Sequence, residues 1–527
     1  MVVIGSGPAG VACASALLGA GADVCMLDGG QDLAPSLRSR LEDLARRPAT
    51  EWDDEAVGFL KGADQASTSG IPMKYAYGSS YPYDHPVGHT MVTGGADTRP
   101  SWARGGLSSV WGAAMLPYRD ADIEAWPVNV ADLAEHYAAV LRFVPVSGRR
   151  DRLAELFPLY TDRLDALPTS AQAERLLDEM ERVAEPARGR GVWFGASRLA
   201  VRASASDAGP GCARCGLCLY GCPHELIYNS VQTVRSLLAS PRFSYRPGVV
   251  VATVHEENGR TRLSATAVPS GDHVEVTADK IFIGAGVLGT TRVMLASREA
   301  WDRPVTMRDS CYYLLPIVRF RGAPAASDEA RHTMAQAFVE ILDPSVSPHT
   351  VHLQLYTYNE LFRSAVRGLL GPADRALGAS IDRSLLSRLL LFQGYLHSDQ
   401  SPTVSVALSA PDAQQASTLV LRANDEPATR PVLRALVRKL RAERSMLGAV
   451  PAGPLLRIGR PGRGFHSGGT FPMRTRPEAF ETDRLGRLGG TGSIHLIDSA
   501  VFPTVPATTI TLTVMANAHR IGTEALA

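Results

Sequence analysis

Four cysteines lie close together in the sequence, and their spacing is typical of a metal or cluster site. Cys212, Cys215, Cys218 and Cys222 follow the pattern C-x2-C-x2-C-x3-C-P. Bacterial ferredoxin loops use this spacing to hold an iron–sulfur cluster. Thiolates two residues apart can turn toward one centre, and the glycines of residues 211–223 leave the backbone free to wrap around it. We therefore predict a metal-type site in this loop, with a [4Fe-4S] cluster as the preferred interpretation.

The sequence leaves alternatives for the bound group and for its fourth ligand. A [3Fe-4S] cluster, a structural zinc ion, disulfides or free thiols are the other interpretations. Zinc ribbons usually separate their cysteine pairs by a longer spacer, and a cytoplasmic location disfavours disulfides. Because the chain has only one such run, either Cys222 or the remote Cys311 is expected to complete a single cluster. Cys13 and Cys25 are interpreted as buried apolar side chains.

A second constellation opens the chain. Gly5, Gly7 and Gly10 form a G-x-G-x-x-G pattern after a short apolar run, and Asp28 follows a second apolar run. The first glycine permits a tight turn, the second lets the backbone approach a pyrophosphate, and the third permits close packing of helix on strand. The helix N-terminus favours the negative charge of the phosphates. This pattern predicts a dinucleotide site in which Asp28 accepts from a ribose hydroxyl.

Three distant parts of the chain carry further glycines, serines and histidines. One stretch, at 102–112, reads WARGGLSSVWG, and another, at 280–292, reads KIFIGAGVLGTTR. Near the end, 465–473 reads FHSGGTFPM, and it is followed by HLIDSAVFP at 495–503 and TLTVMA at 511–516. Together with the opening glycines, and in this order, these stretches resemble the glucose–methanol–choline (GMC) flavoprotein oxidoreductases. The resemblance covers the first and last hundred residues and islands near 105 and 285.

The resemblance implies FAD, bound in an extended form across the nucleotide domain. Gly5, Gly7, Gly10 and Asp28 would hold its ADP part. In the glycine–serine segment beside the flavin, the resemblance implies Gly105, Gly106, Ser108 and Ser109 as cofactor-binding residues. It further implies Gly284 and Gly286 in the late glycine turn, and Asp498 and Ser499 near the ribityl–pyrophosphate region. Some members of the family link FAD covalently through a histidine at the place of Val110, so we expect non-covalent FAD, with His85 and His89 as the other histidines nearby.

His466 occupies the place of the family's active-site histidine. An imidazole suits the removal of a hydroxyl proton at neutral pH while hydride passes to the flavin. The family's second active-site residue, a histidine or asparagine, falls here on Thr509. A threonine hydroxyl can donate a hydrogen bond but is no base at pH 7. We therefore expect His466 to act as the base, with His397 and His495 as possible substitutes for the second residue.

These residues require an α/β fold that brings distant segments together. We predict a Rossmann-like FAD-binding domain from discontinuous segments and an α+β substrate domain with an antiparallel sheet. Helices are expected near 11–20, 131–145, 151–187, 286–296, 360–395 and 429–448, and strands near 312–320, 352–358 and 403–408. The predicted division assigns 1–30, 91–130, 200–300 and 460–527 to the FAD-binding domain, and 31–90, 131–199 and 301–459 to the substrate-binding domain and its helical excursions.

Composition excludes several classes of protein. The net charge of +1 shows no basic footprint, which disfavours nucleic-acid binding. The sequence has no apolar run of about 18 residues, so a transmembrane segment is not expected. The first residues already form the glycine motif and lack a charged secretory leader, which predicts a cytoplasmic location.

The predicted activity is the FAD-dependent oxidation of an alcohol to a carbonyl. The substrate is expected to be a sugar, a glycoside or another small metabolite, because polar and aromatic residues such as Tyr356, Gln393 and Tyr395 recur in the substrate region. An iron–sulfur cluster would carry the electrons singly to a one-electron carrier protein. The alternatives are an oxidase that uses O2, with a zinc-bound or metal-free cysteine loop, and a flavoprotein lyase without redox turnover.

Overall fold

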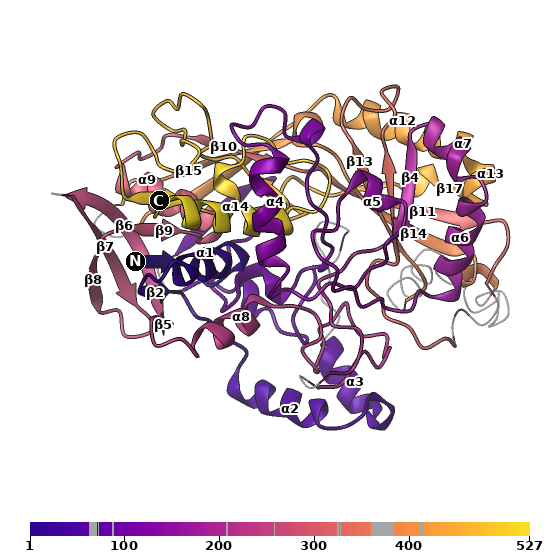
Figure 1. The fold of residues 1–527 in the computed structure, drawn as a ribbon, viewed down its shortest axis with the longest axis horizontal. Helices are drawn as coiled ribbons and strands as arrows, with labels where there is room; N and C mark the ends of the chain where they lie inside the picture. The colour runs from indigo at the N-terminus through magenta and orange to yellow at the C-terminus, as the bar shows by residue number, and fades with distance from the viewer. Residues whose placement is uncertain are drawn as a thin grey trace.

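A five-stranded parallel sheet draws its strands from the whole length of the chain. The computed structural model describes residues 1–62, 71, 73–86, 89–206, 209–257, 259–323, 326, 328–359, 384–411 and 416–526. The sheet lies on the left of Figure 1 and every neighbouring pair in it is parallel. Its order is β20 (Ile494–Leu496), β9 (Ile281–Ile283), β1 (Val2–Ile4), β2 (Val24–Leu27) and β5 (Phe243–Arg246).

Helices that follow glycine turns pack beside this sheet. α1 (Pro8–Gly19) begins with proline in its first turn, where the missing N–H removes no helical hydrogen bond. The C-terminal α14 (Thr511–Glu524) packs against α1 and against α4 (Val130–Val140). α9 (Gly286–Ser297) follows β9 and contacts β6 (Val249–Glu257). The strand β6 forms an antiparallel meander with β7 (Arg260–Ala267) and β8 (His273–Ala278).

A larger antiparallel sheet lies on the other side of the molecule (Figure 1). Its neighbouring strands are antiparallel throughout, and β18 (Arg457–Ile458) pairs with β11 off the main path. The order is β17 (Ala449–Pro451), β11 (Tyr312–Arg319), β14 (Leu389–Tyr395), β13 (Val351–Tyr356), β12 (Ala337–Ile341) and β4 (Val192–Ala196).

The two faces of this sheet differ in polarity. One face is apolar, with side chains such as Leu353, Leu390 and Phe392, and it packs against α6 (Ala171–Glu181) and α12 (Thr429–Ala442) in a second hydrophobic core. Because strand side chains alternate between faces, the residues between them point to the opposite side. That side carries tyrosines, glutamines and a histidine.

A third sheet connects the two regions. β10 (Val305–Asp309) pairs with β15 (Thr403–Leu408) and with the two-residue β19 (Ser467–Gly468). β16 (Thr418–Asn424) continues the sheet, and β3 (Thr90–Gly94) joins its edge in parallel. The strand β19 is thereby fixed directly after His466.

The remaining helices are short. The α-helices are α2 (Pro35–Ala45), α3 (Asp54–Lys61), α5 (Leu153–Leu156), α7 (Ala184–Gly189), α8 (Ser230–Leu237) and α13 (Arg444–Leu447), and the 3-10 helices are η1 (Ala49–Glu51), η2 (Tyr81–Tyr83), η3 (Gly106–Ser109), η4 (Asp120–Asp122), η5 (Ser398–Gln400), η6 (Gly453–Leu455) and η7 (Ser499–Val501). In the described part of the chain, no helix has the length and apolar character needed to cross a bilayer.

The predicted fold class is confirmed: a Rossmann-like parallel sheet from discontinuous segments stands beside an α+β region with an antiparallel sheet. The expected helix over 360–395 is wrong at its end, because Leu389–Tyr395 forms the central strand β14. Residues 360–383 of that prediction lie outside the described residues. The leucine-rich run is compatible with either structure, and pairing on both sides favours the strand.

Candidate active site

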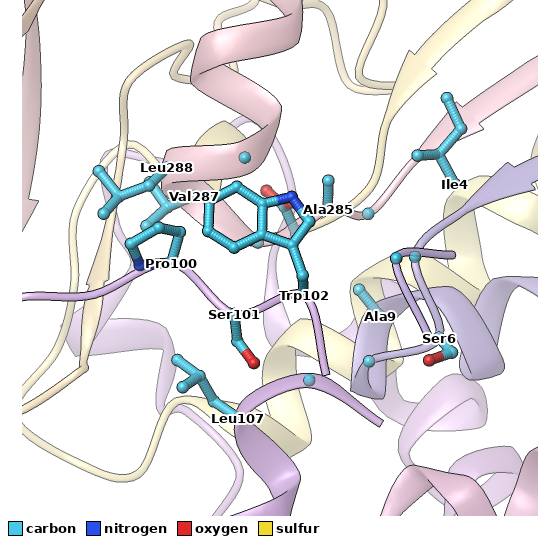
Figure 2. Close-up of a pocket in the computed structure, with 18 of the residues that line it drawn as sticks. Ile4, Ser6, Ala9, Pro100, Ser101, Trp102, Leu107, Ala285, Val287 and Leu288 are labelled. Carbon is cyan, nitrogen blue, oxygen red and sulfur yellow. The ribbon is translucent and has the colours of Figure 1, made fainter. Parts of the chain in front are cut away.

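A cleft opens at the carboxyl ends of β1, β2 and β9, where ligands bind in folds of this kind. It encloses about 1350 Å³ of empty space, open solvent included, and its walls come from segments far apart in the sequence. Figure 2 shows Ser6 and Ala9 on one side, with the Trp102 indole beside Ala285. The predicted cofactor-binding residues in its lining are Gly5, Gly7, Asp28, Gly106, Gly284, Gly286, Asp498 and Ser499.

The opening glycines have two distinct structural roles. Gly5 has φ +96°, and a Cβ there would lie 2.5 Å from the carbonyl oxygen of Gly284. A Cβ on Gly10 would lie 1.9 Å from the carbonyl oxygen of Gly5, so this position must be glycine for α1 to pack on the turn. Gly7 is different, because a Cβ there would meet no atom within 4 Å. It caps α1 and leaves the cleft open in front of the helix N-terminus.

Asp28 closes the second strand with a carboxylate that is already hydrogen-bonded. Ser6 donates to it from its backbone N–H (3.2 Å) and its hydroxyl (2.7 Å), and the Tyr245 hydroxyl donates at 2.8 Å. Burial raises the pKa of Asp28, while these donors oppose the rise. The carboxylate lines the cleft and is held in one orientation, as an acceptor for a ribose hydroxyl must be.

Asp498 organises the opposite wall. Its carboxylate accepts from the Thr290 hydroxyl (2.5 Å) and from the backbone N–H of Ala500 (2.9 Å), and so it caps η7. Burial raises the pKa of Asp498 to about 6. Ser499, the first residue of η7, is thereby fixed in the lining of the cleft.

The glycine–serine segment contributes backbone to the cleft. Gly105 has φ +83° and its N–H donates to the Ser6 hydroxyl at 2.8 Å. A Cβ on Gly106 would lie 3.4 Å from the Cα of Gly7, so Gly106 faces the opening motif across the turn.

The two serines of that segment are bonded to other protein groups. The Ser108 hydroxyl donates to the carbonyl of Gly105 (2.5 Å) and accepts from the backbone N–H of Ser230 (3.0 Å), at the start of α8. Ser109 accepts from the Asn229 side chain at 3.1 Å. Neither serine lines the cleft within the described residues.

His466 lies where the cleft meets the antiparallel sheet. Its neighbours Phe465 and Ser467 line the cleft, and its carbonyl accepts from the N–H of Ser310 at 2.9 Å. Its ring stacks on Tyr395 of β14, with centroids 4.3 Å apart and planes at 15°. Burial, with a smaller effect from His352, lowers the pKa of His466 to about 3. The imidazole is therefore neutral at physiological pH and has a lone pair to accept a proton.

The polar face of the antiparallel sheet continues from His466. Tyr395 is paired in register with His352 of β13 and with Tyr312 of β11. Gln354 of β13 lies opposite Gln393 of β14 in the next rung. The Tyr356 hydroxyl lies 3.7 Å from the position of a Cβ on Gly112, which is solvent-exposed. This absence of a side chain leaves space between the sheet and the end of the glycine–serine segment.

Sequence reasoning missed part of this face. It selected Tyr356, Gln393 and Tyr395, but not Tyr312, His352, Gln354 or Glu340. The alternation V-H-L-Q-L-Y in β13 was a usable signal, because its polar residues occupy every second position.

The other predicted candidates make contacts of their own. The Thr509 hydroxyl accepts from the N–H of Leu116 at 2.7 Å, which leaves its hydrogen free to donate. His495 stacks on Phe282 at 4.9 Å inside the parallel sheet, and its Nδ1 is 2.9 Å from the carbonyl of Leu485. His397 stacks on His349 at 3.8 Å.

The histidine pair is part of a potential metal-binding group. Among the described residues, only His349, His397 and Asp399 bring three potential ligand atoms within 4.8 Å of one another. However, Nδ1 of His397 accepts from the N–H of Asp399 at 3.2 Å, and Asp399 is paired with Arg308 at 2.9 Å. This group is therefore a poor cation site.

The four loop cysteines are neighbours in space. Burial and, to a smaller extent, the thiol of Cys218 raise the pKa of Cys215 to about 11 and that of Cys222 to about 12. The same two influences act on Cys212. Cys311 is in a different place, buried in the second hydrophobic core behind the antiparallel sheet.

Contacts join the cysteine loop to the cleft. The Tyr77 hydroxyl donates to the carbonyl of Cys222 at 3.1 Å. Lys74 donates to the carbonyl of Trp111, in the glycine–serine segment, at 2.7 Å. The carbonyl of Lys74 in turn accepts from Tyr83, whose ring stacks on Phe465 in the cleft lining at 6.0 Å. The segment that contains Lys74, Tyr77 and Tyr83 thus contacts the cysteine loop, the glycine–serine segment and the cleft lining.

Comparison with known proteins identifies the fold. No family model matches the sequence, and no curated protein matches it. Among solved structures, the chain is similar to the crystal structure of pyridoxine 4-oxidase from Mesorbium loti, with a TM-score of 0.60 and 13% sequence identity. The match covers 99% of this chain and 98% of the other. At this identity the likeness establishes a shared fold over the whole length.

Proposed function

We propose that the protein is a flavin-dependent oxidoreductase of the GMC type that oxidises an alcohol to a carbonyl. The observation that carries this proposal is the position of His466: the residues on either side of it line the dinucleotide-type cleft, and its ring stacks on the polar face of the antiparallel sheet. The shared fold with a protein named pyridoxine 4-oxidase supports an oxidation as the reaction class.

The cleft has the features that FAD needs. The N-terminus of α1 opens into it, and unpaired backbone N–H groups there favour a pyrophosphate. Gly7 and Gly286 would permit the close approach of phosphates, since a Cβ on either would project into open space. Asp28 would bind the adenosine ribose, and Asp498 and Ser499 the ribityl end. FAD, when bound, supplies the acceptor for the two electrons of a hydride.

His466 would serve as the base. The alcohol O–H bond breaks and its proton passes to the imidazole, while the carbinol C–H bond breaks with its electron pair and a C=O bond forms. The lowered pKa of His466 keeps the ring in its neutral, accepting form. Protonation would place a charge on a buried ring, so the proton must leave again before the next turnover.

The cysteine loop would hold an iron–sulfur cluster that carries electrons away singly. The spacing C-x2-C-x2-C-x3-C-P supports this part of the proposal, because ferredoxin loops hold their clusters with it. Besides burial, the thiol of Cys218 also raises the pKa of Cys215 and of Cys222, as expected for neighbouring ligands of one group. Cys222 is favoured as the fourth ligand, since Cys311 lies in the other core.

An oxidase is the second candidate. The structural neighbour is named an oxidase, and without a cluster the two electrons would pass to O2 and give hydrogen peroxide. With a cluster, two molecules of a one-electron carrier protein would each take one electron.

The substrate would be a small alcohol with a ring or several hydroxyl groups. The polar sheet face that contacts His466 through Tyr395 offers aromatic surface together with hydrogen-bond donors and acceptors. Such a lining suits a sugar, a glycoside or a hydroxymethyl-substituted ring better than a long apolar alcohol.

The test is to purify the protein without air and measure FAD, iron, acid-labile sulfide and zinc per chain. Anaerobic titration with pyridoxine, benzyl alcohol and glucose then follows the flavin absorbance. One FAD that is bleached by an alcohol supports the proposal, and about four irons and four sulfides support the cluster. FAD that no alcohol reduces would overturn the redox function.

A further inference from the structure

The proposed reaction needs a hydrogen-bond donor for the oxygen that loses its proton to His466. The sequence position expected to supply it is Thr509. Its oxygen accepts from the N–H of Leu116 at 2.7 Å, and this leaves its own hydrogen free to donate. Thr509 is not in ring contact with His466, whereas the polar face of the antiparallel sheet is, through Tyr395, so the donor is sought first on that face.

The polar face of the antiparallel sheet contains a hydrogen-bond network with a defined direction. Gln354 places its amide nitrogen 3.2 Å from Nε2 of His352. An amide nitrogen only donates, so Nε2 of His352 is the acceptor and its hydrogen is on Nδ1. That Nδ1 then donates to the carboxylate of Glu340 at 2.6 Å, on the neighbouring strand. The side chains of His352 and Glu340 are both fully buried, so this bond fixes the donor-to-acceptor direction at the Glu340 end of the network.

Two tyrosines use their hydrogens inside this network. The Tyr356 hydroxyl donates to the amide oxygen of Gln354 at 3.4 Å. The Tyr312 hydroxyl donates to the amide oxygen of Gln393 at 3.4 Å. Each of these phenols therefore has its hydrogen directed at a glutamine.

Tyr395 differs from the other two. Its oxygen accepts from the amide nitrogen of Gln393 at 2.9 Å. The hydrogen of Tyr395 is then left without an acceptor among the described residues. Burial raises the pKa of Tyr395 well above its usual value, so the phenol keeps that hydrogen at any pH used for turnover. The same ring stacks on His466 at 4.3 Å, beside the group that would remove the proton.

We propose that Tyr395 is a catalytic residue whose hydroxyl donates a hydrogen bond to the reacting oxygen of the substrate. This inference rests on the proposed function. As the proton passes to His466, negative charge grows on that oxygen, and a donor fixed in advance stabilises it without reorganising. When the C–H bond breaks, the oxygen becomes the carbonyl oxygen of the product, and Tyr395 retains its own proton throughout. Gln393 orients the phenol and is a positioning residue.

The test compares Tyr395→Phe with Tyr312→Phe and Tyr356→Phe in the FAD-loaded protein. Each variant loses one hydroxyl from the same face and keeps its ring. For an alcohol that bleaches the wild-type flavin, Tyr395→Phe should slow flavin reduction at saturating substrate by about 10²-fold, the effect of removing one donor from a developing oxyanion. The two control variants should lose at most about tenfold, the value of an ordinary hydrogen bond.

A second variant keeps Tyr395 and changes what it donates to. Gln393→Glu replaces the donating amide nitrogen by an accepting oxygen, so the Tyr395 hydrogen turns toward the carboxylate and away from substrate. We expect the same direction of effect as in Tyr395→Phe. This variant tests the inference even where Tyr395→Phe fails to fold or to retain FAD.

Infrared difference spectroscopy with benzaldehyde as the bound probe gives a readout that does not depend on turnover. A hydrogen bond from Tyr395 lowers the carbonyl stretching frequency, so the frequency should rise in Tyr395→Phe and stay unchanged in Tyr356→Phe. Wild-type rates and an unshifted carbonyl in Tyr395→Phe would overturn the inference while leaving alcohol oxidation in place. A wild-type flavin that no alcohol bleaches would overturn both.

Discussion

The dinucleotide-type cleft and the polar face of the antiparallel sheet meet at His466, yet they are built on different principles. The cleft is shaped by backbone: Gly5, Gly7 and Gly10 act through what they lack. The polar face is shaped by side chains that become neighbours through strand register, as His352, Tyr395 and Tyr312 do. A site shaped by backbone requires particular residue types at a fixed local spacing, which the sequence shows. A site shaped by strand register depends on which strands pair, and the pairing is decided by the whole fold.

The largest effect is expected in the cleft. Gly10→Ala would place a Cβ 1.9 Å from the carbonyl of Gly5, where only backbone could move away. We expect a loss of at least about 3 kcal/mol in the free energy of unfolding, the upper end of the usual cost of overpacking, together with loss of FAD. Thermal unfolding and flavin absorbance measure both. Gly19→Ala, at the exposed end of the same helix with no atom near its Cβ, is the control and should keep both properties.

The cysteine loop gives the next largest effect. Cys222→Ser should remove most of the bound iron while FAD stays, because a cluster with three thiolates is held less firmly. Cys311→Ser is the matched control, since this thiol lies in the second core. Iron analysis of the two variants decides whether Cys222 or Cys311 is the fourth ligand. Iron that is retained in Cys222→Ser and lost in Cys311→Ser would reverse the assignment of the fourth ligand.

The pH dependence of flavin reduction examines His466 without any mutation. A histidine with an ordinary pKa of about 6.5 would lose activity about tenfold per pH unit below that value. Burial lowers the pKa of His466 to about 3, so it stays in its basic form as the pH falls. We therefore expect the reduction rate at saturating substrate to stay level from about pH 8 to about pH 5. A midpoint near 6.5 in stopped-flow measurements would contradict the neutral, desolvated ring.

The smallest effect on activity is expected for Ser108→Ala. The hydroxyl joins the Gly105 turn to the start of α8 and does not line the cleft within the described residues. Its loss should lower the free energy of unfolding by about 1–3 kcal/mol, the cost of unpaired buried groups. FAD affinity should be nearly unchanged. Chemical denaturation measures the free energy of unfolding, and a flavin-binding titration measures the FAD affinity. A large loss of FAD affinity without a loss of stability would show that Ser108 contacts the cofactor.

The comparison also shows what the sequence could predict. The glycine turns, the parallel strands and Asp28 follow from local patterns, and Asp498 was implied by the family resemblance. The structure places these groups around one cleft. The strand β14 was expected as helix, because a leucine-rich run fits both periods until its neighbours β11 and β13 are known.

The polar network could not be predicted either, because it also depends on strand pairing that local sequence does not show. Glu340 and His352 are twelve residues apart, and their bond depends on the register of β12 against β13. The hydrogen bond from the N–H of Leu116 to the Thr509 hydroxyl joins residues almost four hundred positions apart, and neither local sequence indicates it.

The most direct test of the account is the rate of flavin reduction in His466→Ala beside the wild type, under anaerobic conditions and with the same alcohol. The residue joins the two regions, and its ring stacks on Tyr395 without a hydrogen bond to that phenol, so the substitution removes the base and leaves the cleft glycines intact. If His466 is the base, the variant should keep its full FAD content and its reduction rate should fall by about 10²–10⁴-fold. An unchanged rate in a variant that retains FAD would contradict this role of His466.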